Sequence, residues 1–116
     1  MKNLVNRVQL IGHLGKDAEA IDVGNGKRLA KVTLATNNTY YGKDGNKIEN
    51  TDWHNLVAWG KTAELMTSLG TKGSKMAVSG KISTRHYEDK EGVKKYITEI
   101  IVDEFMMVGE KIQKPF

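Results

Sequence analysis

The chain has 116 residues and a mass of 12.9 kDa, which suits one compact domain because a second hydrophobic core would leave both too small. Its 39% hydrophobic content excludes a disordered chain, and its 12 glycines argue against a helical bundle. The absence of cysteine excludes disulfides, thiolate metal sites and a cysteine nucleophile, and a net charge of +4 weakly favours a polyanionic partner.

The sequence shows no signal for export or membrane insertion. No run of residues approaches the roughly 18 apolar positions that a membrane span requires, and the first residues lack the apolar stretch and cleavage site of a signal peptide. The lack of cysteine fits a reducing compartment. We therefore expect a cytoplasmic protein.

Alternation of apolar and polar residues predicts the first two strands. Residues 4–11 alternate up to Gly12, which the pattern marks as the end of the strand, and a weaker extended run follows at 18–23. The sequence Gly24-Asn25-Gly26 predicts a turn, because both residue types tolerate a positive φ. Residues 28–36 then alternate cleanly and form the second strand.

A long polar segment separates the second strand from the third. Residues 37–50 contain Asp44-Gly45, a turn signal, so we expect a long hairpin loop there. Residues 51–59 alternate again and place Trp53 and Trp59 on the same face of the third strand. Periodicity alone leaves open whether these indoles belong to the core or to a surface.

The period changes from two to about three after Gly60. Residues 61–69 carry apolar side chains three positions apart with glycines behind them, which predicts a short helix. Period-two alternation returns at 75–87, a charged turn follows at 88–95, and a β-branched run covers 96–108. The predicted order is therefore three strands, a helix and two strands.

This order predicts an all-β fold with one small helix. A helix between the third and fourth of five strands is typical of the Greek-key barrel called the OB-fold, which binds oligonucleotides or oligosaccharides on one sheet face and its flanking loops. An SH3-like barrel would lack the helix. We expect the OB-fold domain over residues 1–108 and a short C-terminal extension at 109–116.

Aromatic side chains stand among basic ones along the predicted strands. Trp53 and Trp59 lie roughly 20 Å apart on one face at the rise of an extended strand. On the strand after the helix, Tyr87 alternates in phase with Lys81 and Arg85, whereas the apolar residues occupy the other face. Exposed rings between cations are what unpaired bases and phosphates require.

The long polar segment adds a second group of aromatic and basic residues. Tyr40 and Tyr41 stand at its start, beside Lys43. We expect Tyr40 to stack on a base, because its neighbours are basic and not apolar. On the last strand, Tyr96 and Phe105 are expected to be packing residues.

Catalytic and metal-binding alternatives find little support in the sequence. A metal-dependent nuclease would have to use the acidic residues of one short segment, which are Asp17, Glu19 and Asp22. The three histidines are dispersed without the spacing of zinc ligands; they are His13, His54 and His86. We expect no enzymatic activity, no metal and no cofactor.

Five segments that run over nearly the whole chain resemble a known family. They are NRVQLIGHLGKDAE (6–19), KVTLAT (31–36), TDWHNLVAWGK (51–61), KGSKMAVSGKISTRHY (72–87) and ITEIIVDEF (97–105). In this order they resemble the bacterial single-stranded DNA-binding proteins. The spacing of these segments is far more specific than a basic patch.

The resemblance implies roles for particular residues. The aromatic positions that stack on bases correspond to Tyr40, Trp53, Trp59 and Tyr87, with tyrosine at the first and last where tryptophan is usual, and tryptophan at Trp59 where phenylalanine is usual. Basic positions near the DNA correspond to Arg85, Lys61 and Lys72, beside which we place Lys43 and Lys81 from the pattern above. Positions at the subunit contact correspond to Asn6 and His54.

The family also implies a function and an assembly. Its members are homotetramers of OB-folds that coat and protect single-stranded DNA, with little regard to sequence, during replication, recombination and repair, associated with the nucleoid. The alternatives are a primosomal or RNA-binding OB protein and, from the fold alone, a saccharide-binding module.

The C-terminal residues depart from the family pattern. Many members end in an acidic tip that closes in Pro-Phe and recruits replication and repair proteins. Here Pro115-Phe116 is present, but Lys111 and Lys114 stand where acids are usual. We therefore do not expect recruitment by this route, and we expect tight DNA binding at moderate salt, because no acidic tip competes for the basic groove.

Overall fold

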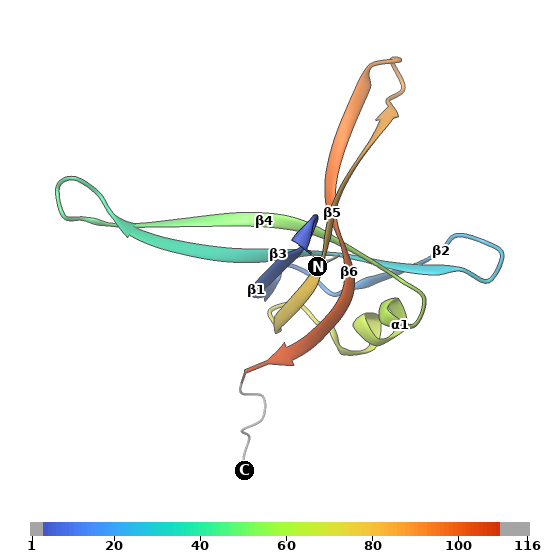
Figure 1. Ribbon diagram of the computed structural model, residues 1–116, viewed down its shortest axis with the longest axis horizontal. Helices are drawn as coiled ribbons and strands as arrows, with labels where there is room; N and C mark the ends of the chain where they lie inside the picture. Colours follow the sequence, from blue (N-terminus) through green and yellow to red (C-terminus); the bar gives the residue numbers. More distant parts are fainter. Residues whose placement is uncertain (1–3, 110–116) are drawn as a thin grey trace, which may run out of the picture.

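The computed structural model describes residues 4–109, which form a curled β-sheet closed into a barrel with a helix packed against it (Figure 1). The elements are β1 (Val8–Leu14), β2 (Glu19–Asp22), β3 (Arg28–Tyr41), β4 (Lys47–Trp59), α1 (Gly60–Leu69), β5 (Lys75–Glu88) and β6 (Lys94–Val108). The sheet order is β1-β5-β6-β4-β3-β2, and pairing of β1 with β3 closes it.

Five strands therefore form the barrel, and β2 is a short additional strand that pairs only with β3 among the described elements. The helix follows the third barrel strand, so the predicted OB-fold and its order of elements are confirmed. The turn predicted between β2 and β3 is also present, with positive φ at Gly24, Asn25 and Gly26.

The core consists of the inward side chains of alternate strand positions. These are joined by one face of α1, where the three-residue spacing predicted from the sequence buries Ala63 and Met66. The largest fully buried side chains are Leu34, Leu56, Met66 and Met76. Burial of each contributes about 1.5–3 kcal/mol to folding, so this core fixes the strands whose other faces remain exposed.

The predicted end of the first strand at Gly12 is wrong. β1 starts at Val8 and continues through Gly12 to Leu14. A Cβ atom at Gly12 would collide with the carbonyl oxygen of Ala35 in β3, so the glycine permits the close crossing that shuts the barrel and does not mark a turn.

The predicted loop at 37–50 is also wrong. β3 and β4 stay paired as far as Tyr41 and Lys47, and the ribbon that they form beyond the barrel is called here the β3–β4 arm (residues 37–50). Polar pairs hold its strands together: the Thr51 hydroxyl donates to Asn37 Oδ1 at 2.9 Å. Because both faces of the arm are exposed to solvent, the apolar alternation that marks a half-buried strand is absent.

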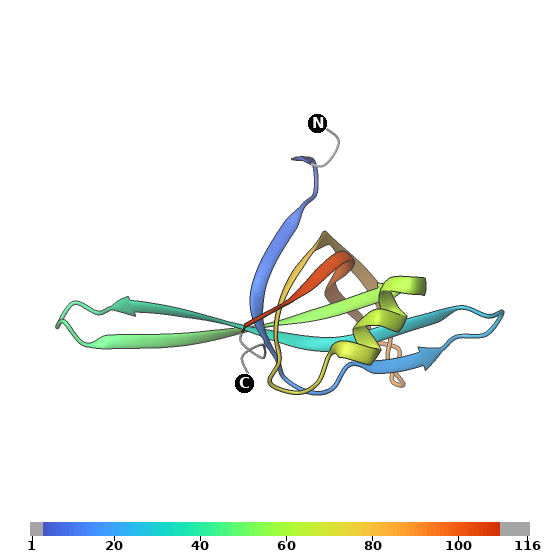
Figure 2. The same ribbon diagram turned by 90° about the horizontal axis from the view of Figure 1, so that it is seen from below.

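A second ribbon projects from the barrel in another direction. β5 and β6 remain paired up to Glu88 and Lys94, so the predicted turn at 88–95 is shorter than expected. We call this ribbon the β5–β6 arm (residues 84–98). Figures 1 and 2 show the two arms leaving the barrel at a large angle to one another.

Over residues 4–109, no helix is long and apolar enough to cross a membrane. The expected extension at 109–116 is described only at Gly109, and Lys111, Lys114 and Pro115-Phe116 lie outside the described residues.

Candidate nucleic-acid interface

One continuous surface runs across four strands on the outside of the barrel. Val57 of β4 is in register with Ile101 of β6, which is in register with Lys81 of β5, so the three side chains lie on the same face. Side chains two positions apart share that face. We call this surface the outer face; its residues include Lys31 and Thr33 of β3, Trp53, Asn55, Val57 and Trp59 of β4, Ile101 of β6, and Lys81, Ser83, Arg85 and Tyr87 of β5.

Both tryptophans belong to the surface and not to the core. Trp53 is 61% exposed and Trp59 is 46% exposed, which settles the alternative that the sequence left open. The core side of β4 is filled instead by the aliphatic side chains between them. Two large rings on one strand, spaced by about the length of six residues, form separate platforms for bases.

Gly15 forms the surface against which the Trp53 indole lies. A Cβ atom at Gly15 would stand 2.6 Å from Cζ3 of the Trp53 ring and 2.7 Å from the Thr33 hydroxyl oxygen. The indole therefore packs directly on the backbone of the segment after β1. This contact orients the ring while most of its area remains open to solvent.

Arg85 is held by a buried carboxylate. Its Nε donates to Oε1 of Glu99 at 3.0 Å and its Nη2 donates to Oε2 at 3.2 Å. Glu99 is 5% exposed, whereas about half of Arg85 faces solvent. The hydrogen bonds that Arg85 donates to Glu99, followed by the negative charge of that carboxylate, raise the pKa of Arg85.

This ion pair leaves part of the guanidinium available. A guanidinium carries five N–H groups, and Glu99 accepts from two of them. The remaining N–H groups can reach a phosphate on the outer face without breaking the pair. Beyond Arg85 on β5, Tyr87 is half-exposed and lies opposite Lys95 on β6.

The lysines predicted to contact DNA lie in four different parts of the barrel and its arm. Lys43 lies in the turn of the β3–β4 arm, Lys61 lies in the first turn of α1 two residues after Trp59, and Lys81 lies on the outer face. Lys72 precedes β5, and its backbone N–H donates to Asp17 Oδ1 at 2.8 Å. Over residues 4–109, none of these four ammonium groups lies within 4 Å of a carboxylate.

The β3–β4 arm presents Tyr40 and Tyr41 on opposite faces of its ribbon. Tyr40 lies opposite Ile48, and Tyr41 lies opposite Lys47, in register with the Trp53 side of β4. Both tyrosines are exposed. The sequence pattern selected Tyr40, but Tyr41 is the more exposed of the two and stands beside a cation.

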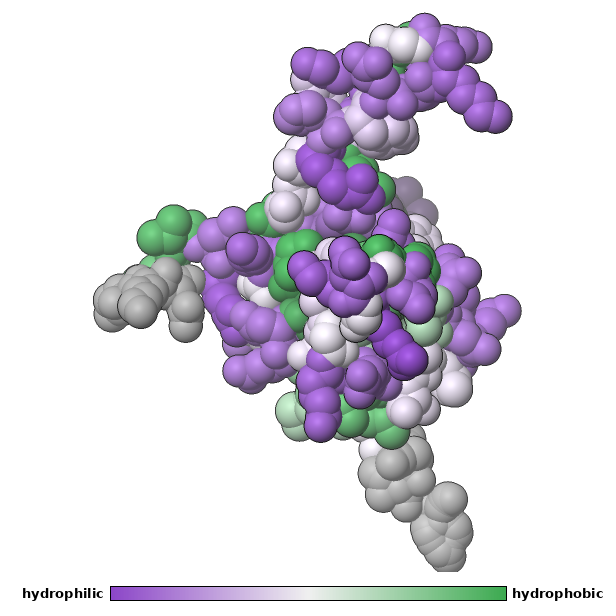
Figure 3. Space-filling model, turned by 90° about the vertical axis from the view of Figure 1, so that its right-hand side faces the viewer, coloured by the Kyte–Doolittle hydropathy of each residue, from purple (hydrophilic) through white to green (hydrophobic). Residues whose placement is uncertain are grey.

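Tyr96 on the β5–β6 arm was expected to be a packing residue, and this prediction is wrong. Its ring is exposed and meets His86 edge-on, with the ring centroids 5.4 Å apart. The arm projects beyond the core, so an inward position on it has no core to enter. Figure 3 shows this arm at the top, standing clear of the body with a mostly hydrophilic surface. Phe105, nearer the barrel, packs against the core as expected.

The two residues expected at a subunit contact have partners within the chain. The Asn6 side chain donates to the carbonyl oxygen of Ile82 and accepts from its N–H, which ties the segment before β1 to β5. His54 Nε2 lies 2.9 Å from the Thr36 hydroxyl. A contact of either residue with a second subunit stays a prediction.

Two of the three acidic residues considered for a metal site accept hydrogen bonds from backbone N–H groups, and the third, Glu19, lies 4.0 Å from the Lys16 ammonium group. Asp17 accepts the N–H of Lys72, and Asp22 accepts the N–H of Gly24 at 3.0 Å. Both carboxylates therefore have a local structural role, in fixing the segments before β5 and between β2 and β3.

A closed five-stranded barrel that exposes aromatic rings among cations defines an oligonucleotide-binding protein of the OB-fold class. The sequence model of the Single-strand binding protein family matches residues 5–108. The chain belongs to this family.

Two relatives and one solved structure are similar over most of the chain. Single-stranded DNA-binding protein 1 of Chlorobaculum tepidum is 41% identical over 108 residues, which cover 92% of this chain and 67% of the relative. Single-stranded DNA-binding protein 1 of Xylella fastidiosa is 42% identical over 108 residues, which cover 92% and 79%. A Plasmodium falciparum SSB complex with ssDNA has a TM-score of 0.81 at 27% identity and covers 90% of this chain and 95% of that one.

Proposed function

We propose that this chain coats single-stranded DNA with little regard to sequence, by stacking unpaired bases on the rings of the outer face and holding phosphates with the surrounding cations. The observation that carries the proposal is that Trp53 and Trp59 are both exposed on one strand face. Membership in the Single-strand binding protein family supports the same function, as does the likeness to a complex with ssDNA.

The mechanism follows from the chemistry of a single strand. Each base exposes a π-face, and stacking on an aromatic side chain contributes about 1–3 kcal/mol per base regardless of its identity. Lysines without a carboxylate partner attract the backbone and release its counterions, which makes binding salt-dependent. Duplex DNA hides the π-faces that Trp53 and Trp59 would receive, so the duplex binds less well.

This function needs no reacting group, and we propose that the chain acts without catalysis. Protection comes from occupancy: bases held on the rings cannot pair into hairpins, and a covered backbone is less accessible to nucleases. We further propose that the protein works in the cytoplasm on DNA exposed during replication, recombination and repair.

We also propose that the chain assembles into a homo-oligomer, a homotetramer in the full assembly. The support lies on the outside of the barrel near the start of β5, where Ile11 of β1, Ala77 of β5 and Met106 of β6 are aligned in one row. Ile11 is 58% exposed and Met106 is 63% exposed. An apolar row of this kind gains stability when a second copy covers it, and linked binding sites raise the affinity for a long strand.

A titration tests the binding mechanism directly. Poly-dT added at low salt should quench the tryptophan fluorescence, because the bases stack on Trp53 and Trp59. Unchanged emission would contradict the proposal. Replacing either ring by Ala should weaken binding, and a matched RNA oligomer bound equally well would favour the RNA-binding alternative.

A further inference from the structure

A groove separates α1 from the hairpin formed by β2 and β3. Its volume is about 1150 Å³, larger than the roughly 300–1,000 Å³ of clefts that hold a small organic ligand. Leu29 and Ala63 contribute to an apolar floor, and the helix presents Thr67 and Ser68 along one rim. The groove can therefore accept a flat ring together with a charged backbone.

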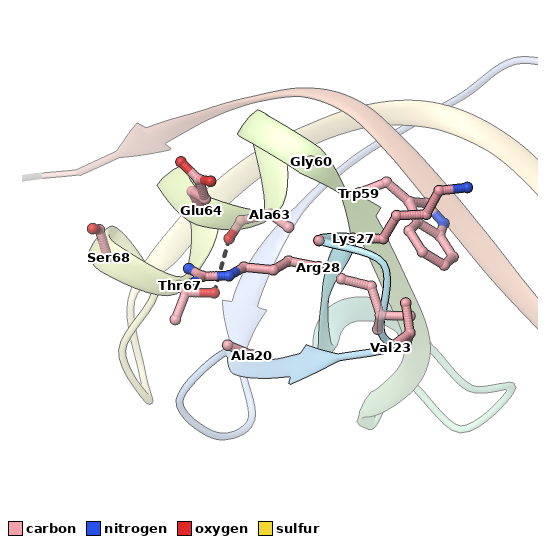
Figure 4. Close-up of a pocket in the computed structure, with 12 residues that line it drawn as sticks. Ala20, Val23, Lys27, Arg28, Trp59, Gly60, Ala63, Glu64, Thr67 and Ser68 are labelled. Atoms are coloured by element: carbon pink, nitrogen blue, oxygen red, sulfur yellow. Dashed lines mark hydrogen bonds between the residues drawn. The ribbon is translucent and has the colours of Figure 1, made fainter.

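The positive charges of the groove lack counterions. Lys27 and Arg28 line it, and within residues 4–109 neither side chain lies within 4 Å of a carboxylate. Figure 4 shows the guanidinium of Arg28 extended toward Thr67, whereas Lys27 lies at the end of the groove near Trp59. Two cations without acidic partners, at separate points along a groove, match an anion with repeating charges.

Trp59 connects this groove to the outer face. It lines the groove at the end where β4 passes into α1, and it is also the last ring on the outer face of β4. A strand that stacks a base on Trp59 therefore meets the groove as its next surface.

We propose that the groove between α1 and the β2–β3 hairpin is an additional subsite for single-stranded DNA, in which Lys27 and Arg28 bind the phosphates that follow the base on Trp59. The proposal rests on the function proposed above. Continuity with Trp59 and the unpaired cations favour a nucleic-acid strand over an acidic peptide, which would gain nothing from the exposed ring.

One carboxylate on the rim opposes the occupant. Glu64 lines the groove, but its side chain points away from Arg28 (Figure 4). Glu64→Gln removes this repulsion and should strengthen the binding of long oligo-dT about two- to fivefold, whereas Arg28→Gln and Lys27→Gln should each weaken it by a similar factor, the range for an exposed ion pair.

Salt dependence separates a phosphate contact from a general loss of charge. Removing one cation that binds a phosphate should reduce the slope of log K against log salt by about 0.7 for a single strand. Lys75→Gln is the matched control, because it removes one positive charge outside the groove and should leave the slope unchanged. Equal slopes for Arg28→Gln and Lys75→Gln would contradict the proposal.

A cross-link locates the strand. Because the chain has no cysteine, Ser68→Cys provides a unique attachment point for a photoreactive group on the rim of the groove. We expect cross-linking to oligo-dT that falls several-fold when Arg28→Gln is added and stays unchanged when Lys75→Gln is added. Normal fluorescence quenching without cross-linking would overturn the groove subsite while leaving the proposed function intact. Cross-linking of the labelled Ser68→Cys variant to polyglutamate but not to oligo-dT would assign the groove to a peptide and overturn the proposal.

Discussion

The indole of Trp53 lies against Gly15, so closely that a Cβ atom at Gly15 would stand 2.6 Å from its ring carbon Cζ3. The two residues come from different parts of the barrel, β4 and the segment after β1. Their contact gives the ring a rigid support and leaves its other side open. A platform for a base has to be held in this way, because a ring that rotates freely loses conformational entropy when the base binds.

Gly15→Ala should displace the Trp53 ring and weaken the binding of oligo-dT. We expect a loss of part of the about 1–3 kcal/mol that stacking on one ring contributes. Fluorescence titration measures the loss, and a double-mutant cycle assigns it. If the effect acts through the ring, Gly15→Ala should add little in a Trp53→Ala background. Full additivity in the cycle would show that Gly15 acts elsewhere.

The buried carboxylate of Glu99 makes Arg85 a structural residue as well as a candidate phosphate contact. Arg85→Met leaves Glu99 buried without a partner and should lower the free energy of unfolding by about 3 kcal/mol or less, since half of Arg85 is already in water. Lys81→Met on the same strand face is the control, with an expected change within about 0.5 kcal/mol. Urea unfolding without DNA measures both. Adding Glu99→Leu to Arg85→Met should restore part of the loss, and equal stability of the two single variants would contradict the assignment.

The barrel and its helix could be predicted from the sequence because they have a hydrophobic side. Alternating apolar residues marked the strands, and the change to a three-residue spacing marked α1, whose Ala63 and Met66 are buried. Where no side is buried, this signal is missing. The β3–β4 arm was therefore expected to be a loop, although polar cross-strand bonds such as that between Thr51 and Asn37 keep it extended.

The sequence pattern also could not predict contacts between segments that are distant along the chain. The alternation placed Trp53, Trp59, Arg85 and Tyr87 correctly on strand faces, but it could not show that two strands meet at Gly12 or that Arg85 pairs with a buried acid 14 positions later. Such pairs depend on the register and closure of the barrel. In the same way, the groove beside Trp59 results from the packing of α1 near the β2–β3 hairpin.

The ion pair between Arg7 and Asp103 should make stability depend on pH in the acid range. The Arg7 guanidinium donates to Asp103 at 2.7 Å and holds the pKa of that carboxyl below its ordinary value. The stabilisation is therefore present above the pKa of the unfolded chain, about 3.9, and is lost as the pH falls through the lower pKa of the folded chain.

Asp103→Asn should accordingly destabilise the protein slightly at pH 7, and the difference from the parent chain should shrink as the pH falls below about 4, the ordinary pKa of an aspartate in the unfolded chain. Thermal unfolding at several pH values measures it. The control is Glu64→Gln, which removes an exposed carboxylate that has no ion-pair partner within 4 Å in residues 4–109. A difference that persists unchanged at pH 2 would exclude the pair as its cause.

Assembly can be separated from folding at the apolar row on β1, β5 and β6. Ile11→Glu places a charge in the centre of this row, where a second copy would have to bury it without a partner. We expect light scattering to report a smaller assembly than that of the parent chain. The melting profile of the individual barrel should change little, because the Ile11 side chain is already exposed within one chain.

Val93→Glu in the turn of the β5–β6 arm is the matched control, since it adds the same charge at an exposed apolar position away from the row. If the Ile11→Glu and Val93→Glu variants both formed assemblies of the same mass as that of the parent protein, another face of the barrel would have to carry the assembly.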